Sequence, residues 1–199
     1  MIISSERPTA LIGERINSTG KKRLTAALKS SDLSLVKQEA MAQVEAGADV
    51  LDVNLGAAGV DEVDLLTKAV HLLMETVDVP VAIDPSNLQA LAEALDVYRE
   101  LAPEGKPPVD SVNGEEEHLD QVLPLVKEHR AAVIGLWMDD EGIPSTAERR
   151  VEIAPKIVER AEALGIERVD VVIDCLALTV ATDQTAGRVT LETIWRVRE

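Results

Sequence analysis

The sequence contains no phenylalanine, and aromatic residues make up only 2% of its 199 positions. Its core therefore has to be built from Val, Leu, Ile and Ala, side chains that are typical of β/α layers. A single cysteine, Cys175, excludes an internal disulfide and a metal site made only of cysteines. The three histidines fall in predicted helices without the spacing of metal ligands, so we predict no metal.

Long hydrophobic runs and an excess of positive charge are also missing. No apolar stretch approaches the roughly 20 residues that cross a bilayer, and residues 1–8 lack the pattern of a signal peptide. The formal net charge of −16 argues against nucleic acid and anionic membranes, because both attract clustered Lys and Arg. We therefore expect a cytoplasmic protein that binds neither nucleic acid nor a membrane.

What is present is a regular alternation of strand and helix patterns, at about 30 residues per unit. Apolar runs of strand length occupy residues 9–13, 48–56, 79–84, 109–114, 131–138 and 169–174. Each run is followed by helical spacing of apolar residues, within 32–47, 63–77, 88–98, 115–126, 145–165 and 191–195. Ser145 to Glu148 fits a capping box at the start of the fifth helix. Because no linker divides the chain, we predict one domain over residues 1–199.

This alternation predicts an α/β fold with parallel strands and right-handed crossovers. A TIM-type (β/α) barrel has eight units and needs about 250 residues. We therefore predict such a barrel with about six units, lacking the last two. A doubly wound open sheet would also accommodate six units, but its Gly-rich phosphate turn is absent after the first strand, where the chain reads Gly-Glu-Arg-Ile-Asn.

Acids and amides recur at the C-terminal ends of the predicted strands, which form the active face of a β/α barrel. They are Glu14 and Asn17, Asp52 and Asn54, Asp84 and Asn87, Asp110 and Asn113, Asp139, and Asp174. Asparagines are also common cap and turn residues, and Asp139 is most simply a turn acid outside the site. Asp84 and Asp174 follow apolar runs that we expect to be buried, where a carboxyl group has to be hydrogen-bonded or protonated.

Converging carboxylates with few basic residues nearby favour a ligand rich in N–H donors. A carboxylate can accept hydrogen bonds from both the ring N–H and the exocyclic amine of a 2-amino-4-oxo pyrimidine edge, as it does from a guanidinium. A hard cation is the alternative for a cluster of acids. Because these acids come one per strand and alternate with amides, the pattern favours an extended planar ligand, a pterin.

At these residues the sequence resembles the pterin-binding methyltransferases. This family includes the methyltetrahydrofolate:corrinoid methyltransferases and the folate-binding domain of cobalamin-dependent methionine synthase. Dihydropteroate synthase shares the barrel, but its first-strand motif differs. The resemblance runs in order from about residue 9 to 178 and rests on Ile12-Gly13-Glu14-Arg15-Ile16-Asn17, Leu51-Asp52-Val53-Asn54-Leu55-Gly56, Ile83-Asp84-Pro85-Ser86-Asn87, Asp110-Ser111-Val112-Asn113, Ile134-Gly135-Leu136 and Val172-Ile173-Asp174.

The resemblance implies a barrel that binds methyltetrahydrofolate as substrate and passes its N5 methyl group to the cobalt of a corrinoid (cobalamin) on a partner protein. By position, Asp84 and Asp174 would hold the hydrogen-bonding edges of the pterin, and Asp110 would be the fourth-strand site residue. We assign catalysis to Asp84 and Asp110. The other expected binding residues are Glu14, Asn17, Asp52, Asn54, Ser86 and Asn113.

Two departures from the family pattern leave other functions open. The family usually has asparagine where this chain has Asp110, and it carries an asparagine near N5 on a seventh strand that this sequence lacks. A pterin- or folate-binding module without catalysis is one alternative, and an enzyme like dihydropteroate synthase is another. An open barrel also leaves unpaired edges at its first and sixth strands, so we predict a homo-oligomer.

Overall fold

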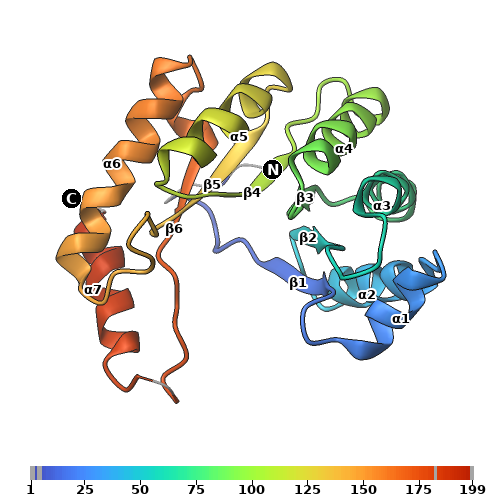
Figure 1. Cartoon of the computed structure of the whole chain (residues 1–199), viewed down its shortest axis with the longest axis horizontal. Coiled ribbons are helices and arrows are strands. Elements are labelled where there is room, and N and C mark those ends of the chain that lie inside the picture. Colours follow the sequence, from blue (N-terminus) through green and yellow to red (C-terminus); the bar gives the residue numbers. More distant parts are fainter. Residues whose placement is uncertain (1–2, 4–5, 182, 198–199) are drawn as a thin grey trace. The chain divides into compact units, whose positions relative to one another are not determined.

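A computed structural model of the chain describes residues 3, 6–181 and 183–197. Strands alternate with helices along this part of the chain, with two helices between the first and second strands (Figure 1). Six strands occur, and every described pair between them is parallel. The predicted α/β class with six βα units is therefore confirmed. The chain divides into two compact units, residues 1–110 and 111–199, and the single domain over residues 1–199 stays a prediction.

The first unit is a parallel sheet with helices packed against it. Its strands β1, β2 and β3 pair in chain order, and β3 continues to the beginning of β4. The bounds are β1 Ile12–Asn17, α1 Lys22–Lys29, α2 Ser34–Glu45, β2 Val50–Asn54, α3 Glu62–Thr76, β3 Val81–Ile83, α4 Leu88–Leu101 and β4 Pro108–Val112. The register sets Asn17 beside Asn54 and Asp52 beside Ala82. Successive strands thus end together at one edge of the sheet.

Aliphatic side chains fill the core of the first unit, as the composition predicts. Helix α3 packs against α4 (Figure 1), and Leu73 and Leu95 from these helices are fully buried. The side chains of β3 are all buried, as are all but the last of β2. Truncating a buried leucine such as Leu73 to alanine typically costs about 2–5 kcal/mol of stability.

The first strand differs from its prediction. It was expected over residues 9–13 but lies at Ile12–Asn17, so Glu14 is inside the strand and not beyond its end. The pairing with β2 is irregular between Gly13 and Ile16. There the backbone N–H of Arg15 donates to the side-chain oxygen Oε1 of Gln43 at 2.8 Å. The strand was misplaced because its side chains are mostly polar and exposed, which gives no apolar run.

Helix α1 was not predicted at all. It has eight residues and buries only Leu24 and Leu28, which is too short a pattern to recognise by spacing. The next helix agrees better with prediction. Asp32 accepts a hydrogen bond from the Ser34 N–H at the start of α2, and Gly47 follows its end with a φ of +98°, a backbone conformation that favours glycine.

The second unit repeats the same alternation. Its elements are α5 Glu116–Glu128, β5 Ala132–Leu136, α6 Ala147–Ala163, the short 3-10 helix η1 Arg168–Asp170, β6 Val171–Asp174 and α7 Ala186–Val197. Strands β5 and β6 pair in parallel, and α6 packs against α7. The predicted capping box is shifted by one residue. Thr146, and not Ser145, is the N-cap of α6, and its Oγ1 accepts from the Arg149 N–H at 3.4 Å.

Within residues 3, 6–181 and 183–197, none of the helices combines the length and the apolar character that crossing a bilayer requires.

Candidate functional site

Four acids of the first unit form what we call the acid cluster. Its centre is Asp52, the third residue of β2, whose side chain is only 2% exposed. Burial, followed by the charges of the other three acids, raises the pKa of Asp52 to about 8. The members are Glu14 in β1, Asp52 in β2, Asp84 after β3 and Asp110 in β4. Acids within or just after the first four strands thus act on one another electrostatically, and their role in binding a ligand stays a prediction.

Asp52 is a neutral carboxyl group at pH 7. Its raised pKa means that the proton stays bound, although a hydrogen bond from the backbone N–H of Val53 favours the charged form. Its Oδ1 is buried and has no hydrogen-bond partner among the described residues. A buried polar atom without a partner costs about 1–3 kcal/mol. A ligand that offers a matching group at this oxygen would remove that cost.

Asp84 is held by an amide from the neighbouring strand. The Nδ2 of Asn54 donates to Oδ2 of Asp84 at 2.9 Å, and Oδ1 of Asn54 accepts from the Gly56 N–H at 3.1 Å. Burial is the main cause that raises the pKa of Asp84, with Glu14 and Glu62 acting in the same direction, whereas the hydrogen bond from Asn54 lowers it. Asn54 thus fixes the orientation of a carboxyl group that is half-buried.

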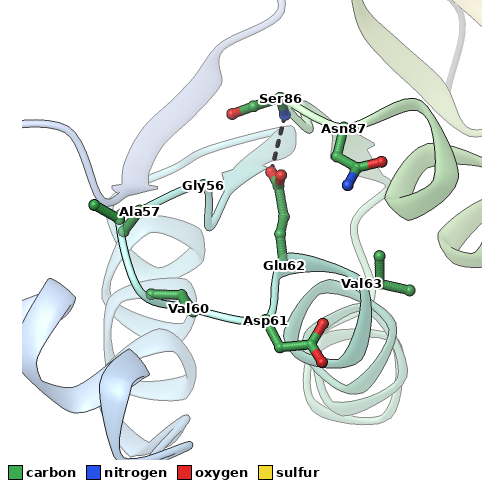
Figure 2. Close-up of a pocket in the computed structure, with 9 residues that line it drawn as sticks. Gly56, Ala57, Val60, Asp61, Glu62, Val63, Ser86 and Asn87 are labelled. Atoms are coloured by element: carbon green, nitrogen blue, oxygen red, sulfur yellow. Dashed lines mark hydrogen bonds between the residues drawn. The ribbon is translucent and has the colours of Figure 1, made fainter.

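A pocket of about 550 Å³ is lined by Gly56 and Ser86, each two residues beyond a member of this pair, and not by Asn54 or Asp84 themselves. It lies between the loop that follows β2 and the loop that follows β3 (Figure 2). Figure 2 shows the Glu62 side chain reaching across the pocket, where its Oε1 accepts from the Ser86 N–H at 2.8 Å. Gly56 lines the wall next to Ser86 and Glu62, and a side chain at this position would collide with both. Ser86 itself is exposed.

Two other polar residues at this pocket have structural roles. Asn87 is the N-cap of α4, and its side chain accepts from the Gln89 N–H at 2.8 Å. Asp61 is the N-cap of α3 and accepts from the Asp64 N–H at 3.2 Å. Their oxygens satisfy helix N–H groups that would otherwise lack partners. The cap explanation for Asn87 is therefore correct.

The end of β1 connects to the same pocket through Ser18, which sequence reasoning missed. Asn17 is half-buried, and its Oδ1 accepts from the Thr19 N–H at 2.9 Å. The buried Ser18 donates from its backbone N–H to the Asn54 carbonyl oxygen at 3.1 Å and from Oγ to the Gly56 carbonyl oxygen at 2.6 Å. These bonds join the loop after β1 to the loop after β2. Ser18 was missed because the segment Ser18-Thr19-Gly20 has the composition of an ordinary turn.

The remaining predicted site residues belong to the second unit. Asn113 is buried, and its Oδ1 accepts from the Glu115 N–H at 3.0 Å just before α5. Asp174 ends β6, and its Oδ1 accepts from the Leu176 N–H at 2.8 Å. We expected Asp174 to be buried, but it is exposed, because the residues of β6 before it are themselves only partly covered. That Asp174 and Asn113 join the acid cluster stays a prediction.

No metal centre emerges from the described part of the chain, which contains no group of three or more His, Cys, Asp or Glu residues arranged to hold an ion. In the acid cluster, the raised pKa of Asp52, about 8, keeps a proton on a group that a cation would need ionised. A protonated Asp52 near the Asp84 carboxyl group, which the Asn54 amide orients, is suited instead to a ligand with both N–H donors and acceptor nitrogens.

The family model described as pterin binding enzyme matches residues 13–199. The chain belongs to this family. The acid cluster, the strand ends that carry it and the pocket between the loops after β2 and β3 all lie within the matched residues.

Relatives and solved structures agree with this membership. Methionine synthase of Mycobacterium leprae (strain TN) is 30% identical over 203 residues, which cover 98% of this chain and 16% of that protein. Methylcorrinoid:tetrahydrofolate methyltransferase of Eubacterium limosum is 29% identical, with coverage of 87% and 62%. The chain thus spans less than two thirds of either relative.

A crystal structure of Yersinia pestis dihydropteroate synthase superimposes with a TM-score of 0.61 at 18% identity, over 90% of this chain and 63% of that one. At this identity the similarity shows the fold, and dihydropteroate synthases are TIM barrels. The predicted barrel class is therefore confirmed.

Proposed function

We propose that this chain binds methyltetrahydrofolate through the acid cluster and transfers its N5 methyl group to the cobalt of a corrinoid carried by a partner protein. Membership of the pterin-binding family and the names of the two relatives support a folate substrate and corrinoid chemistry. The observation that carries the proposal is Asp52, a buried carboxyl group whose pKa of about 8 is raised by burial and by three other acids.

Asp84 is suited to hold the pterin edge. Asn54 orients its carboxyl group at 2.9 Å, and the other side-chain oxygen can accept from a ring N–H or the exocyclic amine. A hydrogen bond from the ligand to this carboxyl would favour its charged form and offset the burial that raises its pKa. In the proposal, Asp174 accepts from the same heterocycle, and Asn17, Ser86 and Asn113 lie around it.

The chemical difficulty is the leaving group. When the N5–CH3 bond breaks, its electron pair stays on N5, and a tertiary amine releases its substituent slowly unless that nitrogen is protonated or hydrogen-bonded. Asp52 carries a proton at neutral pH and can donate it toward N5, where the bond strengthens as charge develops. The carboxylates of Asp84 and Asp110 keep that proton on Asp52, because their charges disfavour its ionised form.

The corrinoid would supply the nucleophile, a reduced cobalt that accepts the methyl group. In the proposal this chain does not bind that metal directly. It orients the folate and provides the proton, and the partner brings the cobalt to the open face of the site.

A titration and a transfer assay together test the proposal. The wild-type chain should bind methyltetrahydrofolate in calorimetry, and adding reduced cobalamin should convert the folate to its demethylated form. Asp84→Asn should weaken binding, whereas Asp78→Asn should not, because Asp78 is an exposed acid of the same unit outside the cluster.

The outcomes separate the candidate functions. Binding of methyltetrahydrofolate without any demethylation would support a folate-binding module and contradict the proposed methyltransferase activity. Condensation of a pterin pyrophosphate with aminobenzoate by this chain would replace the proposal with dihydropteroate synthesis.

A further inference from the structure

A second pocket of the first unit is lined by lysines. It encloses about 350 Å³ between the loop after β1 and helix α1, and its lining consists of Ser18, Gly20, Lys21, Lys22, Thr25, Ala26 and Lys29. Lys22, Thr25, Ala26 and Lys29 are spaced by three and four residues, so they share one face of α1. The opposite face carries the buried Leu24 and Leu28. The helix therefore turns its cationic face to the pocket.

Two lysines of this pocket, Lys22 and Lys29, form no ion pairs with acids in the described part of the chain. Within the described residues, neither Lys22 nor Lys29 has a carboxylate within ion-pairing distance, although the chain as a whole carries 36 acids against 20 Lys and Arg. Lys21 has a structural contact, since its Nζ donates to the Arg15 carbonyl oxygen at 2.6 Å. Two cations that line a cavity and lack acidic partners are suited to an anionic ligand.

This lysine pocket adjoins the candidate site. Ser18 lines it and donates to the Gly56 carbonyl oxygen at 2.6 Å, and Gly56 lines the larger pocket between the loops after β2 and β3. The Lys29 side chain also passes Gly59 in the loop before α3, where its Cε lies 3.8 Å from the position of a Cβ. Gly56 in turn donates to the Asn54 side chain, whose amide holds Asp84. Hydrogen bonds thus connect the loop beside the lysines to the strand end that carries Asn54 and to Asp84.

We propose that the lysine pocket binds the glutamate carboxylates at the far end of the folate, with Lys22 and Lys29 as the contacting residues. This rests on the proposed function, because the ligand has to place its pterin in the acid cluster and its carboxylates outside it. A folate has this polarity, with N–H donors on the pterin and anionic carboxylates on the tail. In a chain of net charge −16, a dianionic tail would be repelled unless local cations receive it.

The test compares ligands with and without the tail. Calorimetry would measure the binding of methyltetrahydrofolate, of a methylated tetrahydropterin that lacks the aminobenzoyl-glutamate, and of aminobenzoyl-glutamate alone. The variant is Lys22→Gln with Lys29→Gln, which leaves the structural contact of Lys21 intact. The control is Lys37→Gln, an exposed lysine on α2 outside the pocket.

We expect the double variant to bind methyltetrahydrofolate about tenfold more weakly, a loss of about 1.4 kcal/mol that is reasonable for two partly exposed ion pairs. The tail-less pterin should bind both proteins equally, and the control should match the wild type. The difference should shrink at high salt. Equal affinity of the wild type and the double variant for methyltetrahydrofolate would overturn the proposal.

Failure of the proposed function gives a different result. If the tail-less pterin does not bind the wild type but aminobenzoyl-glutamate does, and binds the double variant more weakly, the lysine pocket stands and the acid cluster is not the pterin site. If inorganic phosphate binds the lysines but aminobenzoyl-glutamate does not, the pocket takes phosphate and the assignment to a folate tail is wrong.

Discussion

Asp52 shows how one residue changes character with its surroundings. It sits in an apolar strand with its side chain 2% exposed and three other acids near enough to raise its pKa to about 8. Folding therefore binds a proton that the unfolded chain, with an ordinary aspartate pKa near 3.8, releases at neutral pH. Asp52 is therefore protonated at neutral pH in the folded chain without a bound ligand.

The pH dependence of stability follows from that uptake. Between pH 3.8 and about 8 the folded state holds the Asp52 proton and the unfolded state does not, so the free energy of unfolding should fall as the pH rises through this window. The slope due to one such group is about 1.4 kcal/mol per pH unit. Asp52→Asn, which is neutral at every pH, should lack this part of the slope. Urea denaturation at several pH values measures the difference.

A parallel pair of curves for wild type and Asp52→Asn would contradict the raised pKa. The control is Asp78→Asn, which removes an exposed acid of the same unit and should leave the slope unchanged.

Asp174 allows a test of the binding site at the level of one atom. Its Oδ1 accepts from the Leu176 N–H at 2.8 Å, and an asparagine keeps such an oxygen, so Asp174→Asn should fold normally. It should still weaken pterin binding by more than about 1.5 kcal/mol, the lower end for a hydrogen bond to a charged group. Calorimetry with methyltetrahydrofolate measures this loss. Unchanged affinity in a folded variant would show that Asp174 does not contact the ligand.

At the scale of elements, strand β1 depends on a side chain from helix α2. Gln43 is 6% exposed, and its Oε1 accepts from the Arg15 N–H at 2.8 Å where the pairing of β1 with β2 is irregular. A Cβ at Gly13 would lie 2.5 Å from that same oxygen. The glycine and the glutamine together therefore shape the strand that presents Glu14.

Gln43→Leu should leave the Arg15 N–H without a partner and lower the free energy of unfolding by about 1–3 kcal/mol. Urea denaturation would show the loss. Gln38→Leu is the matched control, because Gln38 is exposed on the same helix and should change stability by less than about 0.5 kcal/mol. Similar effects of both substitutions would show that helix propensity, and not the bond to β1, sets the stability.

The elements that the sequence predicted best are those with long amphipathic patterns. Helix α3 was expected over 63–77 and lies at Glu62–Thr76, because five of its apolar side chains reach the core. β1 was misplaced because its residues are mostly polar and its position depends on contacts between distant residues, such as Gln43 with Arg15. α1 was missed because its apolar pattern is too short to recognise. The N-cap of α6 is Thr146 and not the neighbouring Ser145. Local chemistry does not distinguish them, because both side chains carry a hydroxyl group that can cap a helix.

The site was predicted to a similar extent. Strand-end periodicity located Glu14, Asp52, Asp84 and Asp110, and the structure brings these acids together. The pattern did not single out Asp52 as the protonated member, because its pKa depends on burial and on neighbours from three other strands. It also could not reveal the roles of Ser18 and the lysines of α1, since a cavity between a loop and a short helix leaves no periodic signal.

At the scale of the whole molecule, helix α7 exposes large apolar side chains on its outer face. Its inner face buries Ala186, Val189, Thr190 and Thr193, whereas Leu191 and Trp195 are 71% and 62% exposed, with Ile194 between them. In the described part of the chain, β1 pairs only with β2 and β6 pairs only with β5. Exposed apolar side chains and unpaired strand edges both favour association with another chain.

We therefore expect the 21.5 kDa chain to form a homo-oligomer through α7 with a second copy. Sedimentation should give a mass above the monomer that increases with concentration. Because burying one large apolar side chain is worth about 1.5–3 kcal/mol, Leu191→Gln with Trp195→Gln should weaken self-association at least tenfold. Val169→Gln, which changes an apolar residue that is 82% exposed outside α7, should leave it unaltered. A wild-type chain that sediments as a monomer at every concentration would show that this apolar face is not an oligomer interface.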